Sequence, residues 1–311
     1  MRDRRGLTAA TLRNGAGLVV ELLENGSILA IRHAGILVNQ VLGSPLEGSI
    51  GNVYLRRRSS AGITSFPLLG PASSSRFRAS AEAAQWEGSI EDLDYACTLN
   101  LAAEQATWFW AIRFTNTSTE DLDLDAVLAQ DVGIADEAAV RTNELYTSQY
   151  IDHTILEDDA FGYLICSRQN LPQGDSFPWV MHGCLDGSAG FLTDGFQFHG
   201  LEYKASGVPR ALGLPTLPNA RYQHEFALPT IQSRPVPLAP GGTAEIRFFG
   251  AFEADHVAAS GHEDVAAAIA ARDAYRAAAA PPGAEPTRRP SGLFEAPRLF
   301  DSRDLEPSVL Q

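Results

Sequence analysis

The sequence predicts an all-β protein, built as an antiparallel sandwich or barrel and followed by a C-terminal helix and tail. Apolar runs of strand length recur about every ten residues, and polar turn residues separate them. Only one stretch, beyond residue 254, has the length and composition of a helix. The 311 residues suffice for one large all-β domain or two average domains.

The first strands are predicted to flank a hairpin turn. Residues 15–41 contain two apolar runs on either side of Glu24-Asn25-Gly26-Ser27, and a third short strand follows over residues 36–41. Asn25-Gly26 favours a two-residue turn in which both residues have positive φ. Gly and Pro residues then break the pattern, and the next strand begins at Asn52.

Apolar and polar residues alternate most clearly in the middle of the chain. We predict a loop with room for a short strand over residues 59–75, a turn at Trp86-Glu87-Gly88, and strands over 77–84, 94–101, 108–116 and 122–130. Within 108–116, Trp108 and Trp110 point to one face and Phe109 to the other. Core packing is the expected role of these rings, and a stacking platform for sugars is the alternative.

Strands continue to residue 252, where the composition changes. They are predicted over residues 160–167, 179–185, 190–192, 222–228 and 243–252. We place a domain boundary at residue 254, which separates a β domain of residues 1–254 from a helix and linker of residues 255–311. The helix is expected over 262–280 and ends at Pro281-Pro282-Gly283, and residues 281–311 have the composition of a linker or tail.

Charge and cysteine content exclude several classes of function. The net charge of −14 and the pI of about 4.9 argue against nucleic acid and anionic membranes as partners. Cys97, Cys166 and Cys184 show no C-x-x-C spacing, so we expect no zinc site, and reduced thiols in a cytoplasmic protein. The N-terminus has no apolar core of a secretory signal, and no run of about 18 apolar residues indicates a membrane span.

Sequence motifs for common cofactors and catalytic groups are absent. The chain has no G-x-G-x-x-G, G-x-x-x-x-G-K-[ST], G-x-S-x-G or H-E-x-x-H, so we expect no cofactor and no metal. Asp121, Asp123 and Asp125 alternate on what the pattern indicates is a solvated strand face. Three histidines are predicted to lie singly on strands: His182, His199 and His224.

Residues 141–153, RTNELYTSQYIDH, are the candidate binding site. Tyrosine rings stack on the apolar face of a pyranose, and amide, carboxylate and imidazole groups bond its hydroxyls. In a strand, the two tyrosines would share a face, and the aspartate could orient the histidine. The alternative is a half-buried edge segment whose polar groups bond one another. The predicted site residues are Tyr146, Gln149, Tyr150, Asp152 and His153.

Three motifs resemble a known family. They are W-F-W-A-I-R-F-T-N-T-S at 108–118, L-A-Q-D-V-G at 128–133 and N-E-L-Y-T-S-Q-Y-I-D-H at 143–153. Together they resemble the N-terminal domain of glycoside phosphorylases of glycoside hydrolase family 94, nearest to the β-1,2-oligoglucan phosphorylases and cyclic β-1,2-glucan synthases. The resemblance covers roughly residues 15–275.

This resemblance implies a large antiparallel β-supersandwich of the galactose mutarotase-like kind. In the family, an (α/α)6 barrel follows this domain and carries the catalytic aspartate, which has no matching position here. The resemblance therefore implies no catalytic residue in this chain, a β-glucan oligosaccharide as ligand, and assembly with a barrel domain or chain, or as a homodimer.

Two other functions remain open. The chain could be a mutarotase-like or lyase-like enzyme in which His153 or His199 acts as acid or base. It could also be a free carbohydrate-binding module that uses Tyr146 and Tyr150.

Overall fold

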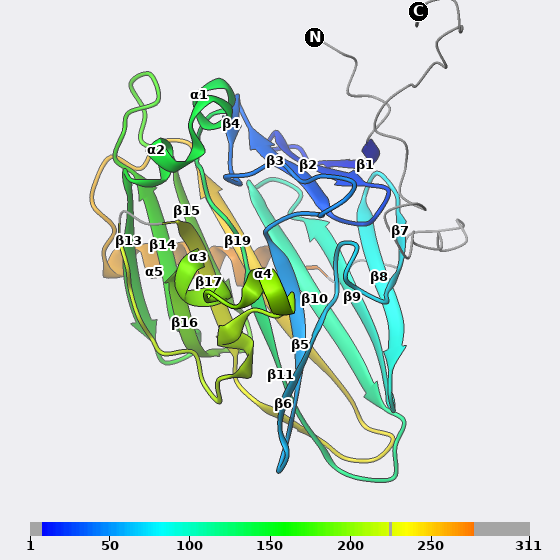
Figure 1. The fold of residues 1–311 in the computed structure, drawn as a ribbon. Helices are drawn as coiled ribbons and strands as arrows, with labels where there is room; N and C mark the ends of the chain where they lie inside the picture. Colours follow the sequence, from blue (N-terminus) through cyan, green and yellow to red (C-terminus); the bar gives the residue numbers. More distant parts are fainter. Residues whose placement is uncertain (1–7, 224–225, 277–311) are drawn as a thin grey trace, which may run out of the picture.

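Three antiparallel sheets make up the body of the protein. The computed structural model describes residues 8–223 and 226–276, and within these ranges every pairing between strands is antiparallel. The all-β prediction is confirmed. Figure 1 shows the sheets stacked, with helices on the outer faces.

The largest sheet has eight strands. In spatial order they are β13 (Ile151–Asp158), β14 (Gly162–Gln169), β15 (Trp179–Cys184), β19 (Thr243–Glu253), β10 (Thr107–Asn116), β9 (Leu93–Leu101), β8 (Ala83–Ile90) and β7 (Arg76–Ala79).

The second sheet has six strands and lies against the first. Its order is β16 (Ser188–Asp194), β17 (Ala227–Ser233), β11 (Leu122–Ala129), β5 (Asn52–Ser59) and β6 (Gly62–Pro67), with β18 (Val236–Leu238) also paired to β11. The third sheet has five strands: β1 (Thr8–Arg13), β2 (Leu18–Leu23), β3 (Ile28–His33), β4 (Ile36–Leu37) and β12 (Ala135–Asp136).

The helices are short, and the main one among the described residues is the predicted C-terminal helix. The α-helices are α1 (Glu137–Thr142), α2 (Glu144–Ser148), α3 (Gly195–His199), α4 (Tyr203–Ser206) and α5 (Val265–Ala274). Two 3-10 turns are η2 (Arg210–Gly213) and η3 (His262–Asp264). Helix α5 is the predicted C-terminal helix, whereas residues 277–280 and the predicted tail lie outside the described residues.

Alternation along the strands builds the core on both faces of the large sheet. Trp108 and Trp110 point inward and join the main hydrophobic core between the sheets, as predicted. Phe109 points to the other face, where it packs beneath helix α5. Helix α5 turns Val265, Ala268 and Ala271 toward that face, because residues three apart share one side of a helix.

The outer face of the six-stranded sheet is covered by the segment that holds α3, α4 and η2. In strand β11, Leu124 and Ala126 face the main core, whereas Val127 and Ala129 face outward. A smaller cluster forms on this outer side and includes Phe198 of α3. Figure 1 shows α3 and α4 in front of β5, β11 and β17.

Two predicted turns differ from the structure. β2 and β3 form the predicted hairpin, but only Gly26 of the pair Asn25-Gly26 has positive φ (72°). The chain around Trp86-Glu87-Gly88 is not a turn but the middle of β8. Gly88 is needed there because a Cβ atom would lie 2.8 Å from the hydroxyl of Tyr95 on β9.

The bounds of several strands also differ from the prediction. The predicted loop over 59–75 contains the six-residue strand β6. The strand predicted over 222–228 begins only at Ala227, and the strand predicted over 36–41 ends at Leu37.

None of the helices in residues 8–223 and 226–276 has the length and apolar composition of a membrane span. In the same ranges, no group of three or more His, Cys, Asp or Glu side chains could hold a metal ion. Cys97, Cys166 and Cys184 are buried and free.

Candidate functional site

The two predicted tyrosines lie together at helix α2 and its C-terminal end, and not on a strand. Tyr146 belongs to α2, and Tyr150 follows its C-terminal end. Because residues four apart share one side of a helix, the rings meet edge to face with centroids 5.1 Å apart. The Tyr150 hydroxyl donates to the Tyr146 hydroxyl at 3.0 Å, and this bond raises the pKa of Tyr150. Tyr146 is exposed, so its ring is accessible at the surface.

The remaining predicted residues point in different directions. Gln149 is exposed beside the tyrosines. His153 is buried, and its Nδ1 lies 2.9 Å from the Ser167 hydroxyl. Gln223 bonds both neighbouring residues: its side chain donates to the Asp152 carboxylate and accepts from the His153 backbone N–H at 2.7 Å. The structure therefore brings Tyr146, Gln149 and Tyr150 together at the surface and leaves the His153 ring in the core.

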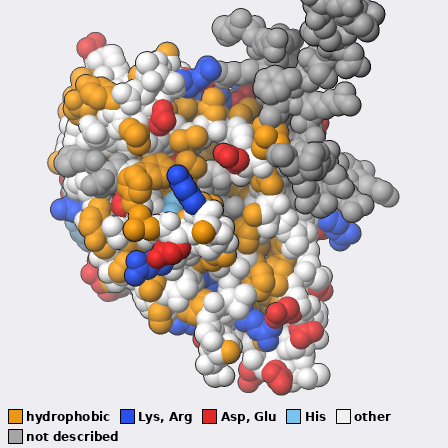
Figure 2. Space-filling view, in the orientation of Figure 1, with side chains coloured by type: hydrophobic (Ala, Val, Ile, Leu, Met, Phe, Trp, Pro, Cys, Tyr) orange, Lys and Arg blue, Asp and Glu red, His pale blue; other side chains and the backbone are white. Residues whose placement is uncertain are grey.

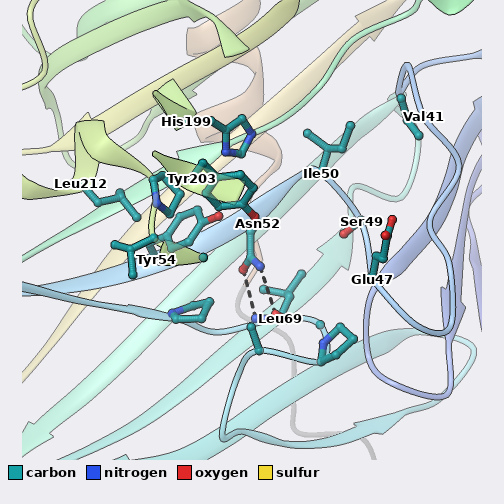
Figure 3. Close-up of a pocket in the computed structure, with 18 of the residues that line it drawn as sticks. Val41, Glu47, Ser49, Ile50, Asn52, Tyr54, Leu69, His199, Tyr203 and Leu212 are labelled. Atoms are coloured by element: carbon teal, nitrogen blue, oxygen red, sulfur yellow. Dashed lines mark hydrogen bonds between the residues drawn. The ribbon is translucent and has the colours of Figure 1, made fainter. Parts of the chain in front are cut away.

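A cavity of about 630 Å³ lies beside this region, on the outer face of the six-stranded sheet. Its floor is formed by strands β5 and β6, one wall by the loop of residues 41–50, and the opposite wall by α3, α4 and residues 207–212. Figure 3 shows the rings of Tyr54 and Tyr203 next to each other below His199, with Glu47 and Ser49 across the cavity.

His199 is the only earlier candidate that lines this cavity, and it ends helix α3 instead of lying on a strand. Its ring lies 4.3 Å from that of Tyr203, and its Nδ1 is buried with no hydrogen-bond partner among the described residues. Burial lowers the pKa of His199 to about 4, so the imidazole is neutral at pH 7. The predicted strand position of His182 is confirmed, whereas His224 lies outside the described residues.

The Tyr54 hydroxyl is available to hydrogen-bond a ligand, whereas the Asn52 side chain already has hydrogen-bond partners in the protein. Burial raises the pKa of Tyr54 well above its ordinary value, so its hydroxyl stays protonated. That hydroxyl has no hydrogen-bond partner within the described ranges. Asn52 is occupied, because its side chain donates to the Leu69 carbonyl at 3.0 Å and accepts from the Leu69 N–H at 3.1 Å.

A buried ion network holds the covering segment on the sheet. Asp125 was predicted on a solvated face, and this was wrong: its carboxylate is fully buried and accepts from Arg56 at 2.5 and 2.8 Å and from Arg58 at 2.8 Å. Arg56 also donates to the carbonyls of Leu212 and Leu214, at 3.2 and 2.8 Å. Because Leu212 lines the cavity, this network fixes one of its walls.

A second buried carboxylate fixes the opposite wall. Asp131 accepts from the backbone N–H groups of Gln40 and Val41 at 2.9 and 2.8 Å. Burial raises the pKa of Asp131 to about 6, and these backbone bonds oppose the rise. The Gln40 side chain donates to the Glu144 carbonyl of α2 at 3.0 Å. One loop thus contacts both the cavity, through Val41, and the helix that carries Tyr146.

The cavity was missed from the sequence because four distant segments build it. Asn52 and Tyr54 were assigned only to a strand, and Tyr203 to no site. Local periodicity indicates which face of a strand a residue occupies, but it does not show what covers that face.

Comparison with known proteins identifies a family and a relative. The family model described as the SOGP N-terminal domain matches residues 21–250. A 1,2-beta-oligoglucan phosphorylase of Listeria innocua serovar 6a is 34% identical over 218 residues, which cover 70% of this chain and 19% of the relative. The aligned part therefore spans about a fifth of that relative's length.

Solved structures match this chain at very low sequence identity. A bacterial glucoamylase complexed with acarbose matches with a TM-score of 0.52 and 7% identity, over 86% of this chain and 34% of the glucoamylase. A polysaccharide lyase matches with a TM-score of 0.47 and 10% identity, over 79% of this chain and 32% of the lyase.

Proposed function

Because the chain belongs to the SOGP N-terminal domain family, we propose that it is a non-catalytic part of a β-1,2-oligoglucan phosphorylase-type enzyme. In this role it supports binding of a β-glucan oligosaccharide and assembles with an (α/α)6 barrel that carries the catalysis. The observation that carries the proposal is the 34% identity to a 1,2-beta-oligoglucan phosphorylase over a region that makes up 19% of that protein. The chain is a carbohydrate-related β-sandwich domain, and the linkage, the barrel and the assembly are the proposed details.

Exposed apolar side chains support a role in assembly. Phe196 is 63% exposed and Leu201 is 96% exposed, both in the segment that covers the six-stranded sheet. Leu145 and Tyr146 of α2 are also exposed. Figure 2 shows hydrophobic side chains on the face over α2, α3 and α4. Apolar groups gathered on one face are typical of a surface that contacts another domain or chain.

The first test of this proposal is phosphorolysis. We expect the isolated chain to release no glucose 1-phosphate from β-1,2-linked glucose oligosaccharides and phosphate in a coupled assay. Turnover is expected when the chain is mixed with the barrel-bearing remainder of the Listeria relative, because the chain would replace the matching domain of that enzyme.

The barrel-bearing remainder assayed alone is the control for the mixture. Turnover by the purified chain would contradict a non-catalytic role. A mixture no more active than the remainder, together with separate sedimentation of the two proteins, would contradict the proposed assembly.

The surface group of Tyr146, Gln149 and Tyr150 belongs to the same proposal as a contact for the oligosaccharide. Replacing Gln149 and Tyr150 together by alanine is expected to weaken oligosaccharide binding by about tenfold, since a stacking ring and an amide are lost. The melting temperature should change little, because surface substitutions away from buried networks are usually within about 0.5 kcal/mol. Calorimetric titration and thermal unfolding of the same samples measure both quantities.

Leu145→Ala is the matched control, since Leu145 is exposed on the same helix but offers neither a ring nor an amide. A purely structural role would give the opposite pattern in the double variant. Stability would then fall by about 1–3 kcal/mol as buried groups lose their partners, with oligosaccharide binding unchanged.

A further inference from the structure

A cavity lies between the covering segment and strands β5 and β6. Its volume of about 630 Å³ falls within the range of roughly 300–1,000 Å³ that is typical of small-molecule pockets. Two buried carboxylate networks, at Asp125 and Asp131, hold its opposite walls in place. Its shape therefore depends on fixed elements of the fold.

The charge of the lining argues against an anionic ligand. Glu47 is the only charged side chain among the described residues that line the cavity, and none of them is Lys or Arg. A phosphate group or an acidic sugar would meet a carboxylate and no cation, in a chain of net charge −14. Anionic ligands are therefore disfavoured.

The polar groups available to a ligand both donate and accept hydrogen bonds. The hydroxyls of Tyr54, Tyr203 and Ser65 have no hydrogen-bond partner within the described ranges. The neutral imidazole of His199 has one donor and one acceptor nitrogen, and its Nδ1 is unpartnered among the described residues. Sugar hydroxyls have the same dual character, so this set matches them better than it matches a purely accepting anion.

The apolar part of the lining completes the match. Ile50, Leu69 and Leu212 line the same space, next to the rings of Tyr54 and Tyr203 (Figure 3). A pyranose has an apolar face of C–H groups and a rim of hydroxyls, and aromatic and aliphatic side chains bury such a face.

We propose that this cavity binds a neutral glucose oligosaccharide, with Tyr203 as the stacking ring and Tyr54 and His199 as hydrogen-bonding groups. The ligand class rests on the proposed function, whereas the location of the site rests on the cavity. The site differs from the surface group of Tyr146, Gln149 and Tyr150, since none of those residues lines the cavity.

The test is calorimetric titration of the full chain with a β-1,2-linked glucose disaccharide and, separately, with glucose 1-phosphate. We expect the disaccharide to bind and glucose 1-phosphate to bind at least about tenfold more weakly. Tyr203→Ala is expected to weaken disaccharide binding by about tenfold, because the stacking ring is lost. Tyr54→Phe keeps the buried ring and removes only the hydroxyl, so a smaller loss of about threefold is expected without unfolding.

Tyr222→Ala is the matched control, because Tyr222 is 42% exposed, close to the 36% of Tyr203, and lies outside the cavity lining. Its binding should equal that of the unmodified chain. The proposal is overturned if the disaccharide does not bind, if Tyr203→Ala and Tyr54→Phe both bind as the unmodified chain does, or if glucose 1-phosphate binds as well as the disaccharide. Loss of binding only in the Gln149→Ala, Tyr150→Ala variant would place the sugar at the surface group instead.

Failure here is distinguishable from failure of the proposed function. The binding test uses the chain alone and needs no barrel. If the cavity binds no sugar, assembly and phosphorolysis can still be observed, and only the cavity proposal fails. If the chain does not assemble with a barrel, sugar binding in the cavity can still be observed, and only the proposed function fails.

Discussion

Replacing Asp125 by alanine is expected to lower the free energy of unfolding by about 3–5 kcal/mol, because it leaves the buried guanidinium of Arg56 without its counter-charge. Both side chains are fully buried, and Arg56 donates to both carboxylate oxygens. The amide of Gln232 also donates to Asp125, at 3.3 Å. Urea unfolding monitored by tryptophan fluorescence measures the loss.

Asp123→Ala is the matched control on the same strand face. Asp123 is paired with Arg58 at 3.5 Å, but its side chain is 50% exposed, so the surrounding water screens the interaction. Its removal should cost less than about 1 kcal/mol. Equal losses in the two variants would show that the buried network does not stabilise the fold in the way described.

A paired substitution separates the charge from the packing. Arg56→Met with Asp125→Leu removes both charges at once, and replacing a buried ion pair by apolar side chains of similar volume is often close to neutral. We therefore expect this double variant to be more stable than Asp125→Ala alone. It also loses the bonds from Arg56 to the Leu212 and Leu214 carbonyls, so its cavity wall should be less firmly held.

The strands could be predicted because their pattern is local. Alternation over residues 108–116 was enough to put Trp108 and Trp110 on one face and Phe109 on the other, and the structure shows that the first face lies in the main core and the second beneath helix α5. Turn chemistry was less reliable, because Gly88 was interpreted as a turn residue. It is required in a strand by the neighbouring Tyr95 ring, which is a contact across the sheet.

The sites could not be predicted in the same way because they depend on contacts between distant segments. Asp125 alternates with Asp123 on one strand face, and only the segment around Leu212, almost ninety residues later, makes it buried. Tyr146 and Tyr150 were expected to share a face only if they lay in a strand, whereas in the structure helix α2 and its C-terminal end bring the two rings together. A periodic pattern specifies an element's faces, and tertiary packing decides what each face meets.

The buried imidazole of His182 is expected to make the protein less stable at low pH. His182 lies in β15, is buried in the core, and meets Trp108 edge to face with ring centroids 5.8 Å apart. Neither of its ring nitrogens has a hydrogen-bond partner among the described residues. Burial, with a smaller contribution from the nearby His153, lowers the pKa of His182 to about 3. The native protein therefore holds this imidazole neutral well below pH 6.5.

This shift in pKa makes the protein less stable as the pH falls. Below the unfolded-state pKa of 6.5 the unfolded chain binds a proton that the native protein does not, so the stability contributed by neutral His182 is present at pH 7 and declines toward pH 3. At 1.36 kcal/mol per pKa unit, the full loss is about 5 kcal/mol, with about 2 kcal/mol lost by pH 5. His182→Phe is expected to remove this component, so its free energy of unfolding should fall less steeply than that of the unmodified chain.

Urea unfolding of both proteins from pH 7.5 to pH 4 measures the difference, and the other titrating groups cancel because both proteins contain them. Val180→Ala is the control on the same inward face of β15, since it removes an apolar contact and no titrating group. Its unfolding free energy should lie below that of the unmodified chain by a constant amount across this range. Parallel pH profiles for His182→Phe and the unmodified chain would contradict a neutral buried imidazole, because protonation of the unfolded chain alone requires the two profiles to diverge below pH 6.5.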